Sequence, residues 1–167
     1  EIENADELQI RPHHLLCMSC FHGGRPDKDI VPIAEDNLEE VIRTMQRRPD
    51  VRVRLIDGCC MICPPCSRYS MDCGLCLGGS SMALRDRKKD LDVLDLTGLS
   101  FGDVLPAGEL LKLIYERIES TLQVCGFRDG VERSAEWRIC GGENVNTRYP
   151  GARDRGMDIS GAKPETS

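Results

Sequence analysis

The chain has 167 residues, 40% of them hydrophobic and 4% aromatic, and a formal net charge of −6. This length suits one domain with a modest core. The negative charge argues against nucleic-acid binding, which needs clustered Lys and Arg, and no segment approaches the roughly 20 apolar residues of a membrane span. The acidic residues 1–6 resemble neither a signal peptide nor a transit peptide. We therefore expect a cytoplasmic protein that binds neither nucleic acid nor membranes.

Hydrophobic periodicity and helix-end signals predict four helices, over residues 12–20, 29–48, 80–96 and 103–125. Pro12 suits the first turn of the first helix, because a backbone N–H is not needed there. Pro49 stops the second helix, Gly98 ends the third and Gly126 ends the fourth. The chain is therefore expected to be mainly helical.

Strand signals are few. Val51, Val53 and Leu55 alternate with arginines, which predicts a half-buried strand, and residues 137–140 are a second candidate. The segment 141–167 is rich in Gly, Arg and Asp and short of apolar residues. We predict a small single domain of the α+β class, mainly helical, with about four helices and one or two short strands around a cysteine-rich metal-binding loop. The domain would span residues 1–140, followed by a loop-rich C-terminal tail over residues 141–167.

Cysteine is the most unusual feature of the composition. The chain has ten, at positions 17, 20, 59, 60, 63, 66, 73, 76, 125 and 140. Six of them fall between Cys59 and Cys76. Cysteines two residues apart in a tight turn are poorly placed for separate disulfides but well placed to face one metal centre. We favour metal binding over a disulfide framework and over unligated thiols.

The run Cys60-x-x-Cys63-x-x-Cys66, with Pro64 after its second cysteine, is typical of bacterial ferredoxins. Such a run supplies three thiolates to an iron–sulfur cluster, and a fourth ligand comes from elsewhere in the chain. The best remote donor is Cys17, on the first predicted helix. So many cysteines at this spacing strongly indicate that thiolates bind a metal, but they say little about which metal it is.

A zinc site is the alternative. Cys63 and Cys66 form one Cys-x-x-Cys pair, and Cys73 and Cys76 form another. About six residues separate the pairs, whereas zinc ribbons usually have more than about a dozen. The zinc site would also leave three cysteines without a role, at positions 17, 59 and 60. The spacing therefore favours iron–sulfur over zinc.

Two histidines precede Cys17 by four and three positions, so His13 or His14 can share its helix face. Each is a candidate metal ligand or a proton carrier near neutral pH. The plainer interpretation is a histidine at a helix start that hydrogen-bonds to the backbone.

The stretch Ile10-Arg11-Pro12-His13-His14-Leu15-Leu16-Cys17, the Cys60-x-x-Cys63-Pro64 run, Cys73, and the helical pair Asp86-Arg87 follow one another along the chain. Together they resemble the uncharacterised prokaryotic family catalogued as domain of unknown function 1284, over roughly residues 8 to 120. The resemblance implies iron–sulfur binding and no particular reaction. Its pattern selects four ligands, Cys17, Cys60, Cys63 and Cys73.

We therefore predict a [4Fe–4S] cluster on those four cysteines, in a redox or cluster-carrying module that serves a redox or cluster-accepting protein. Two alternatives stay open. One is a structural zinc module. The other is an enzyme in which one iron lacks a cysteine and His13 or His14 moves protons.

The remaining cysteines suggest a second site. Cys66 and Cys76 lie in the same loop as the predicted ligands, Cys125 ends the last predicted helix and Cys140 follows the only tryptophan. These four could share a metal. Otherwise Cys125 is a small buried apolar residue and Cys140 an ordinary thiol.

Overall fold

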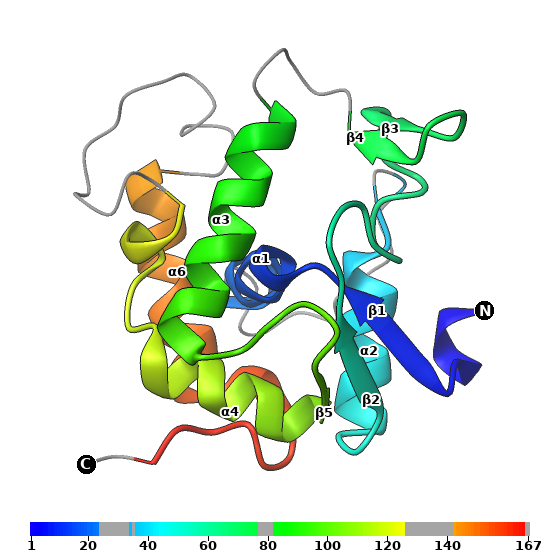
Figure 1. Ribbon diagram of the computed structural model, residues 1–167. Helices are drawn as coiled ribbons and strands as arrows, with labels where there is room; N and C mark the ends of the chain where they lie inside the picture. Colours follow the sequence, from blue (N-terminus) through cyan, green and yellow to red (C-terminus); the bar gives the residue numbers. More distant parts are fainter. Residues whose placement is uncertain (24–33, 35, 77–81, 126–141, 166–167) are drawn as a thin grey trace.

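The computed structural model describes residues 1–23, 34, 36–76, 82–125 and 142–165, with the backbone alone described at 82–85 and 142–147 (Figure 1). Five α-helices lie in these segments: α1 (Pro12–Gly23), α2 (Leu38–Arg47), α3 (Met82–Thr97), α4 (Ala107–Arg117) and α6 (Gly142–Asp154). The strands are short, and three 3₁₀ helices, η1 (Ile2–Asn4), η2 (Thr121–Gln123) and η3 (Gly156–Asp158), complete the described elements. The prediction of a small, mainly helical α+β domain is confirmed. Among the described helices, none has the length and apolar character needed to cross a membrane.

Three strands form the main sheet in the order β1 (Glu7–Ile10), β2 (Arg52–Leu55), β5 (Val104–Pro106). β1 runs parallel to β2, with Ile10 opposite Leu55, and β5 is antiparallel to β2. A separate hairpin pairs β3 (Tyr69–Ser70) with β4 (Leu75–Cys76). β2 confirms the strand predicted from the alternation of valine and arginine, whereas β1 was not predicted.

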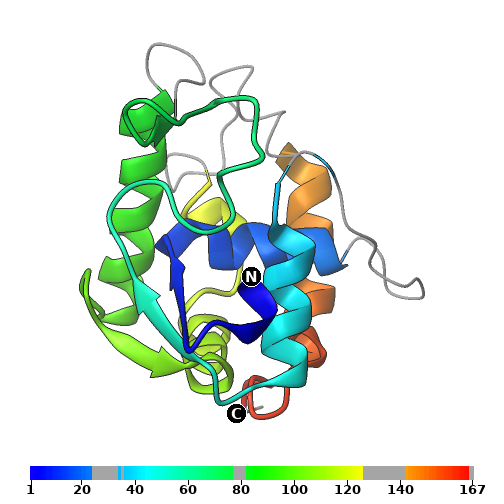
Figure 2. The same ribbon diagram turned by 90° about the vertical axis from the view of Figure 1, so that its right-hand side faces the viewer.

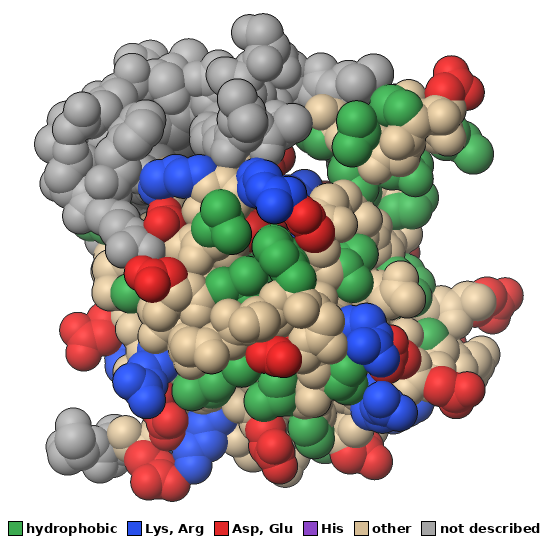
Figure 3. All heavy atoms as spheres, in the orientation of Figure 1, with side chains coloured by type: hydrophobic (Ala, Val, Ile, Leu, Met, Phe, Trp, Pro, Cys, Tyr) green, Lys and Arg blue, Asp and Glu red, His purple; other side chains and the backbone are tan. Residues whose placement is uncertain are grey.

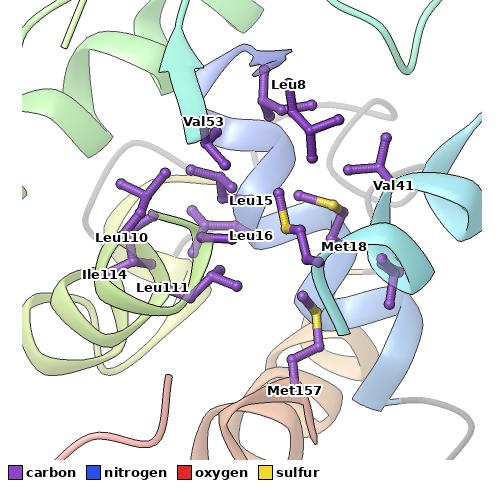
Figure 4. Packing of buried hydrophobic residues seen from close by; sticks show 14 of the residues in the cluster. Leu8, Leu15, Leu16, Met18, Val41, Val53, Leu110, Leu111, Ile114 and Met157 are labelled. Atoms are coloured by element: carbon purple, nitrogen blue, oxygen red, sulfur yellow. The ribbon is translucent and has the colours of Figure 1, made fainter. Parts of the chain in front are cut away.

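Helix α1 lies at the centre of the molecule, with the other helices and the sheet around it (Figures 1 and 2). Its Leu15, Leu16 and Met18 are fully buried. Figure 4 shows Leu15 and Leu16 on the side of α4, near Leu110, whereas Met18 lies near Val41 of α2. Each buried leucine or methionine contributes about 1.5–3 kcal/mol, so α1 is the element that the core is built on.

A buried carboxylate joins α1 to α3. Asp90 Oδ2 accepts hydrogen bonds from Arg11 Nε at 3.0 Å and Arg11 Nη2 at 2.7 Å. Its Oδ1 accepts the backbone N–H of His13 at 3.0 Å and lies 2.7 Å from His13 Nδ1. Asp90 thus caps the N-terminus of α1 from another helix. Burial raises the pKa of Asp90, and the hydrogen bonds from Arg11 oppose that rise.

Two helix boundaries differ from the prediction. The helix expected over 103–125 begins only at Ala107, because the preceding residues pair with β2 as strand β5. It ends at Arg117, and Ser120 then caps η2 with its side chain. In the helix expected over 29–48, Asp36 accepts the N–H of Leu38 at 2.8 Å and α2 starts there. Residue 29, where this helix was expected to begin, lies outside the described residues.

The C-terminal segment 141–167 is a correction, because the loop-rich tail expected there contains α6. Tyr149, Ala152 and Met157 are fully buried. A few apolar residues on one side are therefore enough to pack this segment into the core. α6 packs against α1, where Gly23 allows the close approach: a Cβ at this position would meet the carbonyl of Arg148. The strand expected at 137–140 lies outside the described residues.

The link that Asp90 makes between α1 and α3 can be tested by mutation. Asp90→Ala should lower the free energy of unfolding by about 3–5 kcal/mol, because it leaves the Arg11 guanidinium buried without its carboxylate. The matched control is Asp57→Ala, which removes the exposed partner of Arg87 and should change stability by less than about 1 kcal/mol. Urea unfolding of both variants measures the difference, and equal losses would contradict the assignment of Asp90 as the structural link.

Candidate metal centre

The parallel pairing of β1 and β2 brings the two predicted ligand segments together. Parallel strands end at the same edge of a sheet, so the start of α1 and the cysteine loop leave from neighbouring points. Two backbone hydrogen bonds extend this pairing past the strands: Ile56 N–H to Ile10 O at 3.1 Å, and Met61 N–H to Gln9 O at 3.1 Å. The cysteine loop is therefore held directly against the strand that leads into α1.

The loop itself is a series of turns. The N–H of Cys63 donates to Cys60 O at 3.0 Å, that of Cys66 to Cys63 O at 2.8 Å, and that of Tyr69 to Cys66 O at 2.9 Å. The two Cys-x-x-Cys spacings from Cys60 to Cys66 thus each close one β-turn. The predicted property of this spacing, two cysteines on one tight turn, is present in the structure.

Helix α2 fixes the other side of the loop. Asn37, the N-cap of α2, donates its side-chain amide to Met61 O at 2.9 Å and its backbone N–H to Ile62 O at 3.1 Å. Met61 and Ile62 lie between Cys60 and Cys63 in the chain. Protein groups on both sides therefore satisfy the backbone of this turn and hold it in place.

His14, Cys60 and Cys63 form a compact group. One ligand atom from each lies within 4.8 Å of the other two, and His14 Nδ1 is 3.1 Å from Cys60 Sγ. Around a tetrahedral ion with ordinary zinc bond lengths, such nitrogen and sulfur atoms lie about 3.6 Å apart. The three side chains therefore make a candidate metal site.

The pKa shifts of Cys60 and His14 favour the binding of a cation. Burial opposes ionisation of Cys60, but hydrogen bonds from Cys63 and from the backbone of Arg11 outweigh it and lower its pKa. The bond to Cys60, together with burial, raises the pKa of Cys63, and burial raises that of Cys59 to about 12. Burial also lowers the pKa of His14, which keeps its imidazole neutral. The lowered pKa of Cys60 favours the thiolate form that a metal ligand needs, and a bound metal ion would displace the thiol protons.

A pocket of about 290 Å³ adjoins this group. A water molecule occupies about 30 Å³, so the space exceeds what a single ion needs. Its lining includes five of the cysteines, Cys17, Cys59, Cys63, Cys66 and Cys76, from α1, the turns and the hairpin. Charged side chains also line it, namely Arg11, Asp36, Arg68, Asp86 and Lys89.

Three of the four predicted cluster ligands come together in this region, since Cys17 and Cys63 line the pocket and Cys60 adjoins it. Cys73 is exposed and lies between β3 and β4. Its role as the fourth ligand stays a prediction. Cys76, on β4, lines the pocket instead, as does Cys66 of the second predicted site.

The other predicted site residues take different positions. His13 lines the pocket, but its Nδ1 is bound to Asp90, and burial lowers its pKa well below the usual value. Cys125 follows η2 and packs against the hydrophobic core. Cys140 lies outside the described residues, so the second site also stays a prediction.

Sequence reasoning did not predict buried charges on α3, and it named Asp86 only as part of a helical pair in the family resemblance. Asp86, Lys89 and Asp90 are all buried on α3. They share a helix face with the buried Val93 and Leu94. Charges at three- and four-residue spacing that continue an apolar stripe are the signal that could have revealed a buried polar network.

A cobalt(II) titration should test the compact group. We expect Cys60→Ser and Cys63→Ser each to weaken binding by more than about 100-fold, since even changes to outer residues reduce metal affinity about 10–100-fold. The thiolate-to-cobalt absorption band provides the measurement. Cys20→Ala is the matched control, because Cys20 is a buried cysteine of α1 that belongs to the core. Loss of binding in the control, or its retention in both loop variants, would count against this site.

The comparisons with known proteins identify the family alone. A search of the curated proteins and a search of the solved structures each found no match. A family model described as protein of unknown function (DUF1284) matches residues 35–127. This confirms the resemblance noted in the sequence. Since the match covers more than half of the chain, the protein belongs to the DUF1284 family.

Proposed function

We propose that this protein holds a [4Fe–4S] cluster through cysteine thiolates and acts as a cytoplasmic redox or cluster-carrying module. The observation that carries the proposal is the convergence of sulfur atoms from three segments on one pocket: Cys17 from α1, the turns from Cys59 to Cys66, and Cys76 from the hairpin. A cluster binds four thiolates spread over its irons. Cysteines that reach one pocket from three different segments suit this arrangement.

The number of cysteines and the volume of the pocket both favour a cluster over one ion. A single tetrahedral ion takes four ligands and would leave several thiols around the pocket without a role. A pocket of about 290 Å³ also offers room beyond one ion. We assign Cys17, Cys60 and Cys63 as ligands. Cys73 is the fourth in the set that the family resemblance implies, and Cys66 and Cys76 are the competitors for that position.

The chain also supplies hydrogen bonds to the sulfurs. The backbone N–H of Cys60 donates to Cys63 Sγ at 3.4 Å, and the backbone of Arg11 hydrogen-bonds to the Cys60 thiol group. Such bonds stabilise thiolate charge and adjust the reduction potential of a centre. They would hold the ligands in their anionic form once the protons have left.

A partner protein would meet the centre at the hairpin. Met71 is 88% exposed and Leu75 is 51% exposed, both beside the exposed Cys73. Figure 3 shows hydrophobic side chains on this hairpin together with an acidic one, and hydrophobic, acidic and basic side chains interspersed over the rest of the drawn face. Exposed apolar residues close to a metal centre suit transient docking of a redox or cluster-accepting protein.

Anaerobic reconstitution with iron and sulfide tests the proposal. We expect about four iron and four sulfide per chain, a brown protein, and an EPR signal after reduction by dithionite. Cys63→Ala should abolish the cluster and Cys20→Ala should retain it. Parallel alanine variants of Cys66, Cys73 and Cys76 identify the fourth ligand as the one whose loss reduces iron content. Stoichiometric zinc with no iron after reconstitution would end the cluster proposal.

A mononuclear zinc site is the second candidate, and one observation favours it. The ligand atoms of His14, Cys60 and Cys63 lie within 4.8 Å of one another, which is close enough for a small shift to bring them onto one ion. A nearby cysteine of the pocket, such as Cys17, would complete the tetrahedron.

His14→Ala separates the two candidates. A cluster on four cysteines does not need the imidazole, so we expect the variant to keep its full iron and sulfide content after reconstitution. A mononuclear site would lose one of its ligands, and its zinc affinity would fall by at least about 10–100-fold. Metal analysis and a zinc competition titration provide the two readings. Loss of iron in this variant would favour histidine ligation.

A further inference from the structure

Arg11 is a buried cation beside the sulfur ligands. Its side chain is 6% exposed and lines the pocket. Arginine and lysine are rarely buried unless a carboxylate pairs with them, and here Asp90 does so through Nε and Nη2. Those two bonds use two of the five guanidinium N–H donors. The charge is therefore held in one place at the pocket wall.

The position of this charge relative to the sulfurs follows from the pocket lining. Arg11 lines the same pocket as Cys17, Cys59 and Cys63. Asp90, in contrast, binds Arg11 from α3 and caps α1. The ion pair therefore presents its positive member to the thiol cluster.

We propose that Arg11, positioned by Asp90, raises the reduction potential of the thiolate centre. This inference rests on the proposed function, because it requires a centre that accepts an electron. Reduction adds one electron and no bond is broken, so the reduced centre carries one more negative charge. A fixed cation nearby stabilises that form more than the oxidised form. Arg11 acts on the centre through its field, and Asp90 is a positioning residue that holds Arg11.

Opposite charge changes in the pair should give shifts of opposite sign. Arg11→Gln removes the cation and should lower the reduction potential. Asp90→Asn removes the compensating anion, keeps an oxygen that can accept the His13 N–H, and should raise the potential. A purely structural disturbance has no reason to change sign with the charge.

Each single variant leaves a buried charge without its partner, Asp90 in Arg11→Gln and Arg11 in Asp90→Asn, and is at risk of not folding. The double variant Arg11→Gln/Asp90→Asn avoids this problem, because both partners are neutral and can still hydrogen-bond to each other. We expect its potential to lie below that of the wild type, since the member of the pair that faces the sulfurs has lost its charge.

The test is a redox titration of the reconstituted full chain, with dithionite as the electron donor and EPR as the readout. We expect Asp90→Asn and the double variant to change the ratio of oxidised to reduced centre at a fixed potential by about tenfold, in opposite directions, which is 59 mV for a one-electron couple. The matched controls are Arg87→Gln and Asp57→Asn, which remove the same charges from an exposed ion pair. They should leave the potential unchanged, because solvent screens exposed charges.

The outcomes are distinguishable. Equal potentials in the wild type and all variants, with iron content intact, would overturn the role of Arg11 and leave the proposed function standing. Shifts of the same sign in Asp90→Asn and the double variant would also overturn it, as would equal shifts in the exposed controls. Reconstituted wild-type protein without iron would overturn the proposed function and this inference together.

Discussion

β1 and β2 run parallel with Ile10 opposite Leu55, and this pairing determines where the candidate centre forms. Both strands are only four residues long, yet their shared direction sends α1 and the cysteine loop away from the same edge of the sheet. A register shift of one residue would turn the buried Leu8 and Ile10 toward the opposite face. The hydrophobic core therefore enforces the register, and the register in turn places His14 beside Cys60.

Asp90 connects that arrangement to the rest of the helices. Its carboxylate binds Arg11, the backbone of His13 and the ring of His13, all within the few residues that join β1 to α1. A buried network of this kind stabilises the fold when every member has a partner, and is costly when one is removed. The same carboxylate therefore serves the packing of α1 against α3 and the charge distribution beside the sulfurs.

The cysteine turns were predictable from sequence because their geometry is local: in a loop, a spacing of two residues between cysteines fits one β-turn. The helix starting at Pro12 and strand β2 were predictable for the same reason. β1 was missed although Glu7-Leu8-Gln9-Ile10 alternates polar and apolar residues as β2 does, and its parallel pairing with β2 is a non-local event that no local pattern shows. Helix α6 was missed because its burial depends on the surface of α1, including the gap at Gly23. The fourth ligand belongs to this second class, since the path of the hairpin decides whether Cys73 or Cys76 meets the pocket.

The candidate centre is thus organised to different degrees in its two halves. Cys60 and Cys63 lie in a turn whose backbone is bound to β1 through Gln9 and to α2 through Asn37. Cys73 lies in an exposed hairpin whose two strands have only two residues each. Folding of the core therefore already supplies most of the ordering that a metal needs at Cys60 and Cys63, so little of the binding free energy is spent there. Under the proposed function, a bound metal would add ordering at the hairpin, and the outer ligand is then the position where a partner would reach the centre.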